Sequence, residues 1–410
     1  MDRDQSSRKR RLGKSVLDAA RERIALTFDS FAHVYVSGPS GKDSSVLLHL
    51  ACAEARRRGR RIGVLYLDLE AQYALTIDHV REMFDAYADV IDPYWVALPL
   101  NLRNAVSQLE PFWTCWDPGA EAAWIRKREP RSIADPSTFP FYRHAMEFEE
   151  FVEEFGQWYG RGESTACLVG IRSDESLNRW RAISGGHHRF RGHKWTTWKG
   201  RSLFNCYPIY DWRTEDVWTF FGREGLPYPR TYDLMHKAGV PLSQQRICQP
   251  YGDDQRRGLW LYHVLEPVTW SRVVARVAGA RSGALYANKS GNIQGNRIVE
   301  LPTAHRTWQG FAEFLLSTMP AAEARHYKDK ISVFLHWYES RGYPDGIPDE
   351  ADSHAEAARK APSWRRICKV ILKNDRLCKG LGFSQTSSVA FEKYQKIMRK
   401  RAAKWTMYLR

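Results

Sequence analysis

Apolar and polar positions alternate along the first 170 residues in a way that predicts helices and strands in turn. Between residues 17 and 31 the apolar positions fall at helical spacing, which indicates a helix with one packed face. The expected strands span residues 33–36, 61–67, 94–98 and 166–171, and the helices between them span 44–58, 76–90 and 145–159. This order is typical of βαβ units, so we expect an α/β fold with a doubly wound, mainly parallel sheet.

The rest of the chain divides into segments of different character. Residues 103–140 are rich in Trp, Pro and charge, and residues 184–200 have the Gly-, His- and Arg-rich composition of a surface loop. Beyond residue 211 the pattern becomes mostly helical. We therefore predict an α/β domain over 1–210, a helical region over 211–345, a linker over 346–363 and a basic helical tail over 364–410.

Cysteine usage and hydropathy limit the class of protein. The seven cysteines are an odd number and have no short paired spacing, which argues against a disulfide framework and for a reducing compartment. No stretch approaches the roughly 20 apolar residues of a membrane span. The polar N-terminus lacks the apolar run of a secretion signal. We expect a cytoplasmic protein that does not associate with a membrane.

The net charge of +15 is concentrated near one end of the chain. Residues 359–410 contain 15 Lys or Arg and two acidic residues, so this segment has a charge of +13. Such a segment favours polyanions, nucleic acid (DNA or RNA) first, while a solvated helix face or a contact for an acidic partner explains the same charge. The candidate nucleic-acid-binding residues are Lys393, Lys396, Arg399, Lys400, Arg401 and Lys404.

The turn between the first expected strand and the next helix is the best candidate for chemistry. Small and hydroxyl residues there leave backbone N–H groups and the helix dipole able to attract an anion. A Walker A loop is excluded, because Gly38 and Gly41 are three residues apart and Asp43 follows Lys42 where that motif needs Ser or Thr. The candidate phosphate-binding residues are Ser37, Gly38, Ser40, Gly41, Lys42, Asp43, Ser44 and Ser45.

The segment Ser-Gly-Lys-Asp-Ser at 40–44 resembles the PP-loop of the ATP pyrophosphatase superfamily, usually written S-G-G-x-D-S. The resemblance implies an adenine nucleotide as ligand: ATP, cleaved between its α and β phosphates, or a PAPS-like sulfonucleotide. Pro39 replaces the first Ser of the motif and Ser40 its first Gly. Because a change from Gly to Ser restricts positive φ angles, the loop has either kept this chemistry with the help of a neighbouring Gly or lost it.

Two carboxylates follow the second expected strand and reach the same sheet edge. Asp68 and Glu70 can hold Mg²⁺ against a nucleotide phosphate, or they can cap the next turn. If a metal binds, Asp43 and Asp68 are its candidate ligands. The sequence thus leaves a metal site and a structural role open at this edge.

A basic segment follows the fourth expected strand. Residues 170–179 resemble the G-x-R-x-x-E-S-x-x-R segment of PAPS-reductase-like proteins. The resemblance implies that Arg172 and Arg179 bind anionic groups and that Glu175 orients one of them, since guanidinium groups pair with phosphate oxygens. A surface ion-pair cluster at a helix start is the alternative.

Motifs over nearly the whole chain narrow the resemblance to one subfamily. They include residues 208–212, 252–256, 362–369 and 379–383. Together these resemble IbrA-type proteins related to phosphoadenosine phosphosulfate (PAPS) reductases, whose C-terminal half is a domain of unknown function, DUF3440. The resemblance implies a ParB-like protein partner.

The sequence does not predict sulfonucleotide reduction. A PAPS reductase needs a nucleophilic cysteine in a Glu-Cys-Gly-x-His motif, which is absent, and Cys368 and Cys378 are expected to be buried and structural. We expect instead an enzyme of the ATP pyrophosphatase or adenylyl-transfer type, with Mg²⁺ and with Lys42, Asp43 and Arg172 as catalytic residues acting by positioning and charge neutralisation. The alternative is a catalytically altered nucleic-acid-binding or regulatory subunit of a ParB-like complex.

Overall fold

A computed structural model describes residues 13–107, 110–184, 188–247, 251–252, 258–280, 300–319, 321–373 and 375–383. The chain forms two compact units, and it enters each of them more than once. Unit 1 consists of Met1–Leu98, Arg126–Arg143 and Val152–Ile247, and unit 2 consists of Pro99–Ile125, His144–Phe151 and Cys248–Arg410. Unit 1 therefore extends past residue 210, where the sequence pattern changes.

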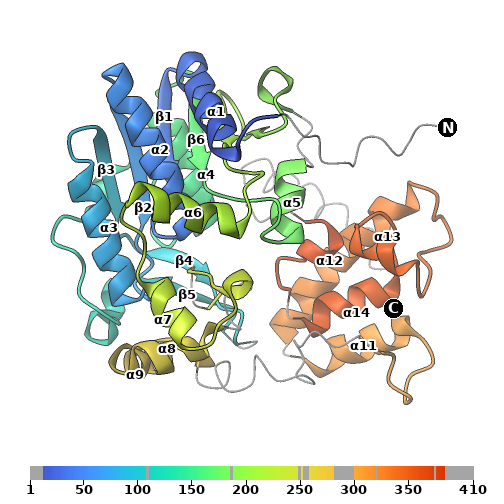
Figure 1. The fold of residues 1–410 in the computed structure, drawn as a ribbon. Coiled ribbons are helices and arrows are strands. Elements are labelled where there is room, and N and C mark those ends of the chain that lie inside the picture. Colours follow the sequence, from blue (N-terminus) through green and yellow to red (C-terminus); the bar gives the residue numbers. More distant parts are fainter. Residues whose placement is uncertain are drawn as a thin grey trace. The chain divides into compact units, whose positions relative to one another are not determined.

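Unit 1 is built on a six-stranded sheet with the order β3-β2-β1-β6-β8-β7. Strands β1, β2, β3 and β6 of this sheet are labelled in Figure 1. All neighbouring strands are parallel except β7 and β8. The strands are β1 (His33–Ser37), β2 (Ile62–Leu67), β3 (Ile91–Val96), β6 (Thr165–Val169), β7 (Thr196–Trp198) and β8 (Leu203–Cys206). The prediction of a mainly parallel sheet in an α/β fold is confirmed.

Helices cover both faces of this sheet. The helices are α1 (Val16–Ser30), α2 (Lys42–Arg58), α3 (Ala74–Ala86), α4 (Phe148–Tyr159), α5 (Leu177–Ser184), α6 (Thr214–Glu224) and α7 (Thr231–Lys237). Val34 and Val36 of β1 belong to a core shared with α1, α2, α3 and α6. The intervening Tyr35 packs against Phe155 and Tyr159 of α4, because successive side chains of a strand point to opposite faces.

The two edge strands differ from the sequence prediction. β3 begins at Ile91, three residues earlier than expected, and contains Pro93. Proline is tolerated at an edge, where an amide is not needed for a further neighbour. On the opposite edge, residues 184–200 contain the three-residue strand β7 and are not only a surface loop. β7 has no pattern of its own and forms by pairing with β8.

Unit 2 is mostly helical, as expected for the C-terminal part of the chain. It contains a hairpin of β4 (Leu100–Arg103) and β5 (Phe112–Cys115). Its helices are α8 (Trp260–Leu265), α9 (Pro267–Arg276), α11 (Trp308–Thr318), α12 (Ala321–Glu339), α13 (Ser353–Ala357) and α14 (Trp364–Leu372). Phe311, Ile331 and Ile367, from α11, α12 and α14, share one apolar core.

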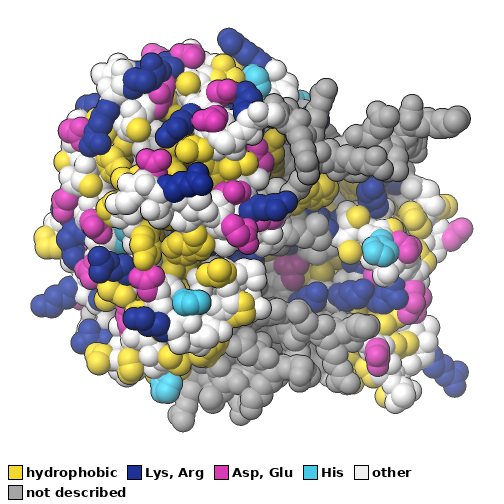
Figure 2. Space-filling view, in the orientation of Figure 1, with side chains coloured by type: hydrophobic (Ala, Val, Ile, Leu, Met, Phe, Trp, Pro, Cys, Tyr) yellow, Lys and Arg dark blue, Asp and Glu magenta, His cyan; other side chains and the backbone are white. Residues whose placement is uncertain are grey.

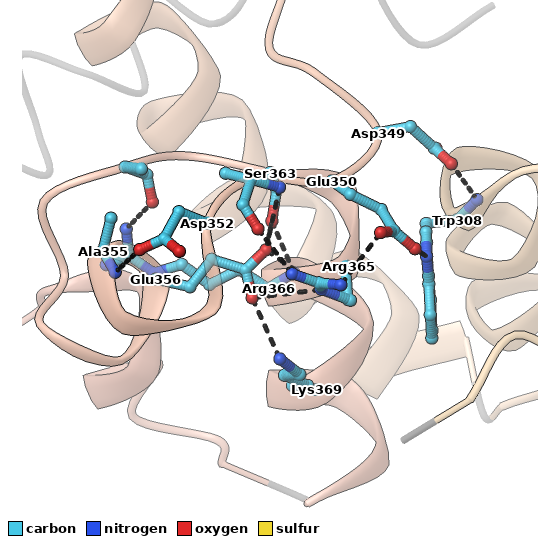
Figure 3. Close-up of polar contacts among 12 residues, drawn as sticks. Trp308, Asp349, Glu350, Asp352, Ala355, Glu356, Ser363, Arg365, Arg366 and Lys369 are labelled. Carbon is cyan, nitrogen blue, oxygen red and sulfur yellow. Dashed lines mark hydrogen bonds and ion pairs between the residues drawn. The ribbon is translucent and has the colours of Figure 1, made fainter. Parts of the chain in front are cut away.

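Residues 346–363, expected as a linker, contain α13 and bind neighbouring helices of unit 2 (Figure 3). The Asp349 carboxylate accepts hydrogen bonds from the backbone amide of Trp308, at 2.9 Å, and from that of Gln309, at 3.0 Å. The buried Glu356 carboxylate accepts from the Ser363 hydroxyl and the Lys369 ammonium of α14. This segment therefore satisfies the first amides of α11 and fixes α14.

The basic tail lies mostly outside the described residues. All six candidate nucleic-acid-binding residues, at 393–404, follow residue 383, where the described part of the chain ends. Within the described residues, no helix combines the length and the apolar composition needed to cross a bilayer.

Candidate functional site

The phosphate loop, residues 37–45, connects β1 to α2 at the carboxyl edge of the sheet. Gly38 has a φ angle of +69°, which favours glycine, and its amide donates to the carbonyl of Leu65 in β2 at 2.9 Å. Gly41 is the N-cap of α2. Ser40 is not among the described residues with positive φ. Ser therefore fits at position 40 without a left-handed backbone, and the left-handed residue of the loop is Gly38.

The amides at the start of α2 are only partly paired. The Lys42 amide donates to the Tyr232 hydroxyl at 3.3 Å, and the Gly41 amide donates to the Ser44 hydroxyl at 3.2 Å. Within the described residues, the amides of Asp43 and Ser44 have no hydrogen-bond partner. Two unpaired donors thus lie at the positive end of a 17-residue helix, which is the arrangement that binds phosphate.

The three predicted catalytic residues meet in one buried chain of alternating charges. The Lys42 ammonium lies 3.2 Å from the Asp43 carboxylate, and Arg172 Nε lies 2.5 Å from the other oxygen of that carboxylate. Arg172 is 2% exposed and also pairs with Asp174 at 2.5 Å. Burial lowers the pKa of Arg172, but Asp43 and Asp174 outweigh it and raise the pKa, so the guanidinium stays charged.

Asp68 lies directly after β2 in a second buried ion pair. Its carboxylate pairs with Arg126 and accepts from the Trp95 indole nitrogen at 3.0 Å. Burial lowers the pKa of Arg126, but the attraction of Asp68 more than offsets this and raises it. Glu70 is also buried and has a φ angle of +64°. Asp68 and Glu70 are therefore fixed structural groups as well as candidate metal ligands.

Acids and cations alternate at this edge of the sheet. The acids on the loops after β1, β2 and β6 are Asp43, Asp68, Glu70, Asp174 and Glu175, and the cations that contact these loops are Lys42, Arg126, Arg172, Arg179 and Arg246. A nucleotide phosphate would add further negative charge here. The carboxylates are oxygen donors of the kind that hard cations prefer, and a role for them in metal binding stays a prediction.

His79 of α3 forms a hydrogen bond with Ser45 of the phosphate loop. Its Nε2 atom lies 2.8 Å from the Ser45 hydroxyl, which in turn donates to the Gly41 carbonyl at 2.9 Å. Burial, helped by the neighbouring His49, lowers the pKa of His79 to about 3, so its ring is neutral. Sequence reasoning missed this residue, because a single histidine in a helix carries no motif.

Gly170 allows β6 to approach the phosphate loop. A Cβ atom at this position would lie 2.6 Å from the Ser44 Cα and 2.7 Å from its amide nitrogen. Only glycine therefore fits between the end of β6 and the first turn of α2. The Gly of the sequence motif brings Arg172, two residues later, to Asp43.

The other two residues of that motif do not join the buried chain. Arg179 pairs with Glu175 at 3.8 Å, and the Arg179 side chain is exposed. The Glu175 carbonyl accepts from Arg246 at 2.5 Å. In the structure, Glu175 and Arg179 thus form an ion pair on α5 and the turn before it, while their predicted role toward a phosphate stays a prediction.

The cysteines offer no reactive thiol in the described part of the chain. The six described cysteines are all buried and free. Burial raises the pKa of Cys368 to about 12 and raises that of Cys378 further. Both are therefore buried thiols, as expected. The described residues also contain no cluster of three or more His, Cys, Asp or Glu that would hold a metal ion.

Comparison with known proteins gives the following matches. The model of the phosphoadenosine phosphosulfate reductase domain matches residues 33–238, and that of the domain of unknown function DUF3440 matches 239–347 and 343–391. The chain is 43% identical over 395 residues to the uncharacterized protein YbdN of Escherichia coli (strain K12), covering 95% of this chain and 96% of that protein.

Two solved structures are similar at low identity. Phosphoadenylyl-sulfate (PAPS) reductase from Candida auris, in a phosphate complex, is 14% identical with a TM-score of 0.33, covering 57% of this chain and 89% of that chain. FMN adenylyltransferase from Candida glabrata, in complex with FMN and an ATP analogue, is 13% identical with a TM-score of 0.31, covering 53% of this chain and 60% of that chain.

Proposed function

Since the chain belongs to the phosphoadenosine phosphosulfate reductase domain family and carries a DUF3440 region, we propose that it binds ATP or a PAPS-like adenine nucleotide at the phosphate loop and transfers its adenylyl group. One observation carries the proposal. The unpaired amides of Asp43 and Ser44 lie beside the buried chain of Lys42, Asp43 and Arg172. Donors for phosphate oxygens and two cations thus stand together at the start of α2 and on the turn after β6.

The proposed reaction occurs at the α-phosphorus. With ATP, a nucleophile of the acceptor gives its proton to solvent and forms a bond to this phosphorus, the bond from phosphorus to the oxygen that bridges the α and β phosphates breaks, and pyrophosphate leaves. With a PAPS-like nucleotide, which has no β phosphate, sulfate leaves instead. Lys42 and Arg172 would stabilise the charge that develops on the phosphate oxygens, and Asp43 would hold both cations in position. No protein nucleophile is required, so positioning and electrostatics provide the catalysis.

Mg²⁺ is proposed as the counter-ion of the nucleotide. A nucleotide polyphosphate carries several negative charges, and hard cations bind carboxylate and phosphate oxygens. Asp43 and Asp68 are the proposed ligands. When bound, the metal would polarise phosphate oxygens, while the residues of the loop orient the nucleotide.

The test is turnover of ATP labelled at the α-phosphate. In the presence of Mg²⁺ the wild-type protein is expected to release pyrophosphate and to transfer the labelled adenylyl group to the acceptor, or to water as labelled AMP. Lys42→Ala and Arg172→Ala are expected to lose at least about 100-fold in rate, the typical effect of removing one charge-stabilising group. Lys14→Ala is the control, because Lys14 is an exposed residue that pairs with Glu22. Equal rates in all four proteins, or no turnover by the wild type with any acceptor, would refute the proposal.

A second candidate function is nucleic-acid binding, as a regulatory subunit with a ParB-like partner. One observation favours it: residues 176–210 contain seven Lys or Arg and no Asp or Glu. Trp180 and Trp198 in this stretch are 51% and 44% exposed. Exposed indoles among cations are suited to stacking on single-stranded bases. Retention of a single-stranded oligonucleotide by the wild type, weakened at least tenfold in the Trp180→Ala, Trp198→Ala double variant, would support this function.

A further inference from the structure

We propose that residues 231–245, called here the gate segment, close the phosphate loop through Tyr232 and open when a nucleotide phosphate replaces the Tyr232 hydroxyl. The segment comprises α7, the following turn and the 3-10 helix Leu242–Gln244. It lies in unit 1, as does the loop. The inference rests on the proposed function and adds a means of controlling access to the same site.

The first observation is the position of the Tyr232 hydroxyl. It accepts a hydrogen bond from the Lys42 amide, which belongs to the first turn of α2 and has no partner within the helix. It also lies 3.6 Å from where a Cβ of Gly41 would be, directly over the N-cap. A phosphate bound to the start of α2 would place an oxygen at this amide. The hydroxyl therefore occupies part of the anion site.

The second observation is that the same segment holds the Lys42 side chain. The Lys42 ammonium donates to the Gln245 carbonyl at 3.3 Å and lies 4.9 Å from the centre of the Tyr232 ring. Lys42 is only 4% exposed. Both the amide and the ammonium of Lys42 are thus bound by the gate segment, and neither is presented to a ligand in this state.

The third observation is that these contacts are long. The hydrogen bonds to Tyr232 and Gln245 are 3.3 Å, and the Thr231 hydroxyl reaches that of Thr76 in α3 at 3.4 Å. The buried Oε1 atom of Gln245 has no partner within the described residues. A charged phosphate oxygen makes shorter and stronger hydrogen bonds than a neutral hydroxyl. Replacement of Tyr232 by phosphate is therefore favourable, and the closed state lowers the apparent affinity.

The first test is calorimetric titration of the full-length protein with ATP and Mg²⁺. Tyr232→Phe removes the competing hydroxyl and keeps the ring, so it is expected to bind ATP about three- to tenfold more tightly, the range of one hydrogen bond. Thr231→Val loosens the anchor to α3 and is expected to tighten binding in the same direction. Tyr210→Phe is the matched control, because the ring of Tyr210 contacts Arg23 and it has no role at the loop.

The second test is amide hydrogen exchange in the wild-type protein with and without ATP. The gate predicts opposite changes: residues 40–45 exchange more slowly once phosphate binds, and residues 231–245 exchange faster. Slower exchange in both segments would mean that residues 231–245 close onto the ligand, which overturns the proposal.

The outcomes separate the two proposals. If the wild type binds ATP and Tyr232→Phe binds it equally or more weakly, the gate is refuted and the nucleotide site stands. If neither protein binds ATP or PAPS, and exchange at residues 40–45 is unchanged by either nucleotide, the proposed function is refuted and the gate with it.

Discussion

At the scale of the residue, His79 links the geometry of the phosphate loop to pH. Burial lowers its pKa to about 3 in the folded protein, whereas an unfolded histidine has a pKa of about 6.5. As the pH falls below 6.5, the unfolded chain binds a proton at His79 while the folded protein does not. The contribution of the neutral His79 to the free energy of unfolding is therefore fully present above pH 6.5 and is lost progressively between pH 6.5 and pH 3. The expected slope is about 1.4 kcal/mol per pH unit.

The His79→Gln variant isolates this contribution. A Gln amide can still donate to the Ser45 hydroxyl but does not titrate. Between pH 6.5 and 5.0 the wild type is expected to lose about 2 kcal/mol more stability than the variant. Urea unfolding at several pH values measures this difference. Parallel pH profiles for the two proteins would show that His79 is not buried as a neutral ring.

At the scale of the element, the packing of β6 against α2 depends on Gly170. In Gly170→Ala the new methyl group meets the backbone of Ser44, so we expect a destabilisation of about 1–3 kcal/mol and loss of at least about tenfold in nucleotide affinity. Gly222→Ala is the control, because a Cβ at Gly222 in α6 meets nothing within 4 Å. Thermal unfolding and ATP titration measure both effects. Unchanged binding by Gly170→Ala would contradict the proposed placement of the phosphate.

The contact between α13 and α14 in unit 2 leads to a second prediction at the scale of the element. Burial raises the pKa of Glu356, but hydrogen bonds from Ser363, Lys369 and Arg365 outweigh it and lower the pKa. Glu356→Gln leaves two cations without their buried partner, so we expect a loss of about 3 kcal/mol in the unfolding free energy of the protein. Glu350→Gln weakens a largely exposed pair with Arg365 and keeps a side-chain oxygen for the Trp308 indole, so it is expected to cost less than about 1 kcal/mol. Equal losses of unfolding free energy in Glu356→Gln and Glu350→Gln would show that the buried ion pairs of Glu356 are no stronger than the exposed pair of Glu350.

The sequence predicted the elements better than the contacts that complete the site. The strand at β1 and the helix after it follow from local apolar periodicity, and the Gly-rich turn between them is a local motif. The partners of the loop are remote: His79 is 34 residues from Ser45, Arg126 is 58 from Asp68, and Tyr232 is 190 from Lys42. No local pattern encodes such pairs, because they form only when the sheet brings the segments together.

At the scale of the whole molecule, the positive charge is unevenly distributed along the chain. On the face shown in Figure 2, Lys and Arg side chains of the described residues are interspersed with Asp and Glu side chains. At the end of α2, for example, Arg56 pairs with Asp89 and Arg57 with Glu54. Such pairs add little net field. In the sequence, the excess of Lys and Arg over Asp and Glu lies in residues 176–210 and 359–410.

The concentration of Lys and Arg near the end of the chain leads to the last prediction, which concerns nucleic-acid binding by the tail. Each phosphate contact adds about 0.7 to the slope of log affinity against log salt for a single strand. If the tail binds nucleic acid, replacing the six candidates Lys393, Lys396, Arg399, Lys400, Arg401 and Lys404 by Gln lowers the slope by up to about four. Replacing Arg56 and Arg57, which already have carboxylate partners, changes it by less than one. Salt titrations with a fluorescent oligonucleotide compare the variants. A cation that neutralises a phosphate changes the number of ions released on binding, and therefore the slope. Equal slopes for the wild type and the tail variant would thus show that the tail does not bind nucleic acid, and would favour an acidic protein partner.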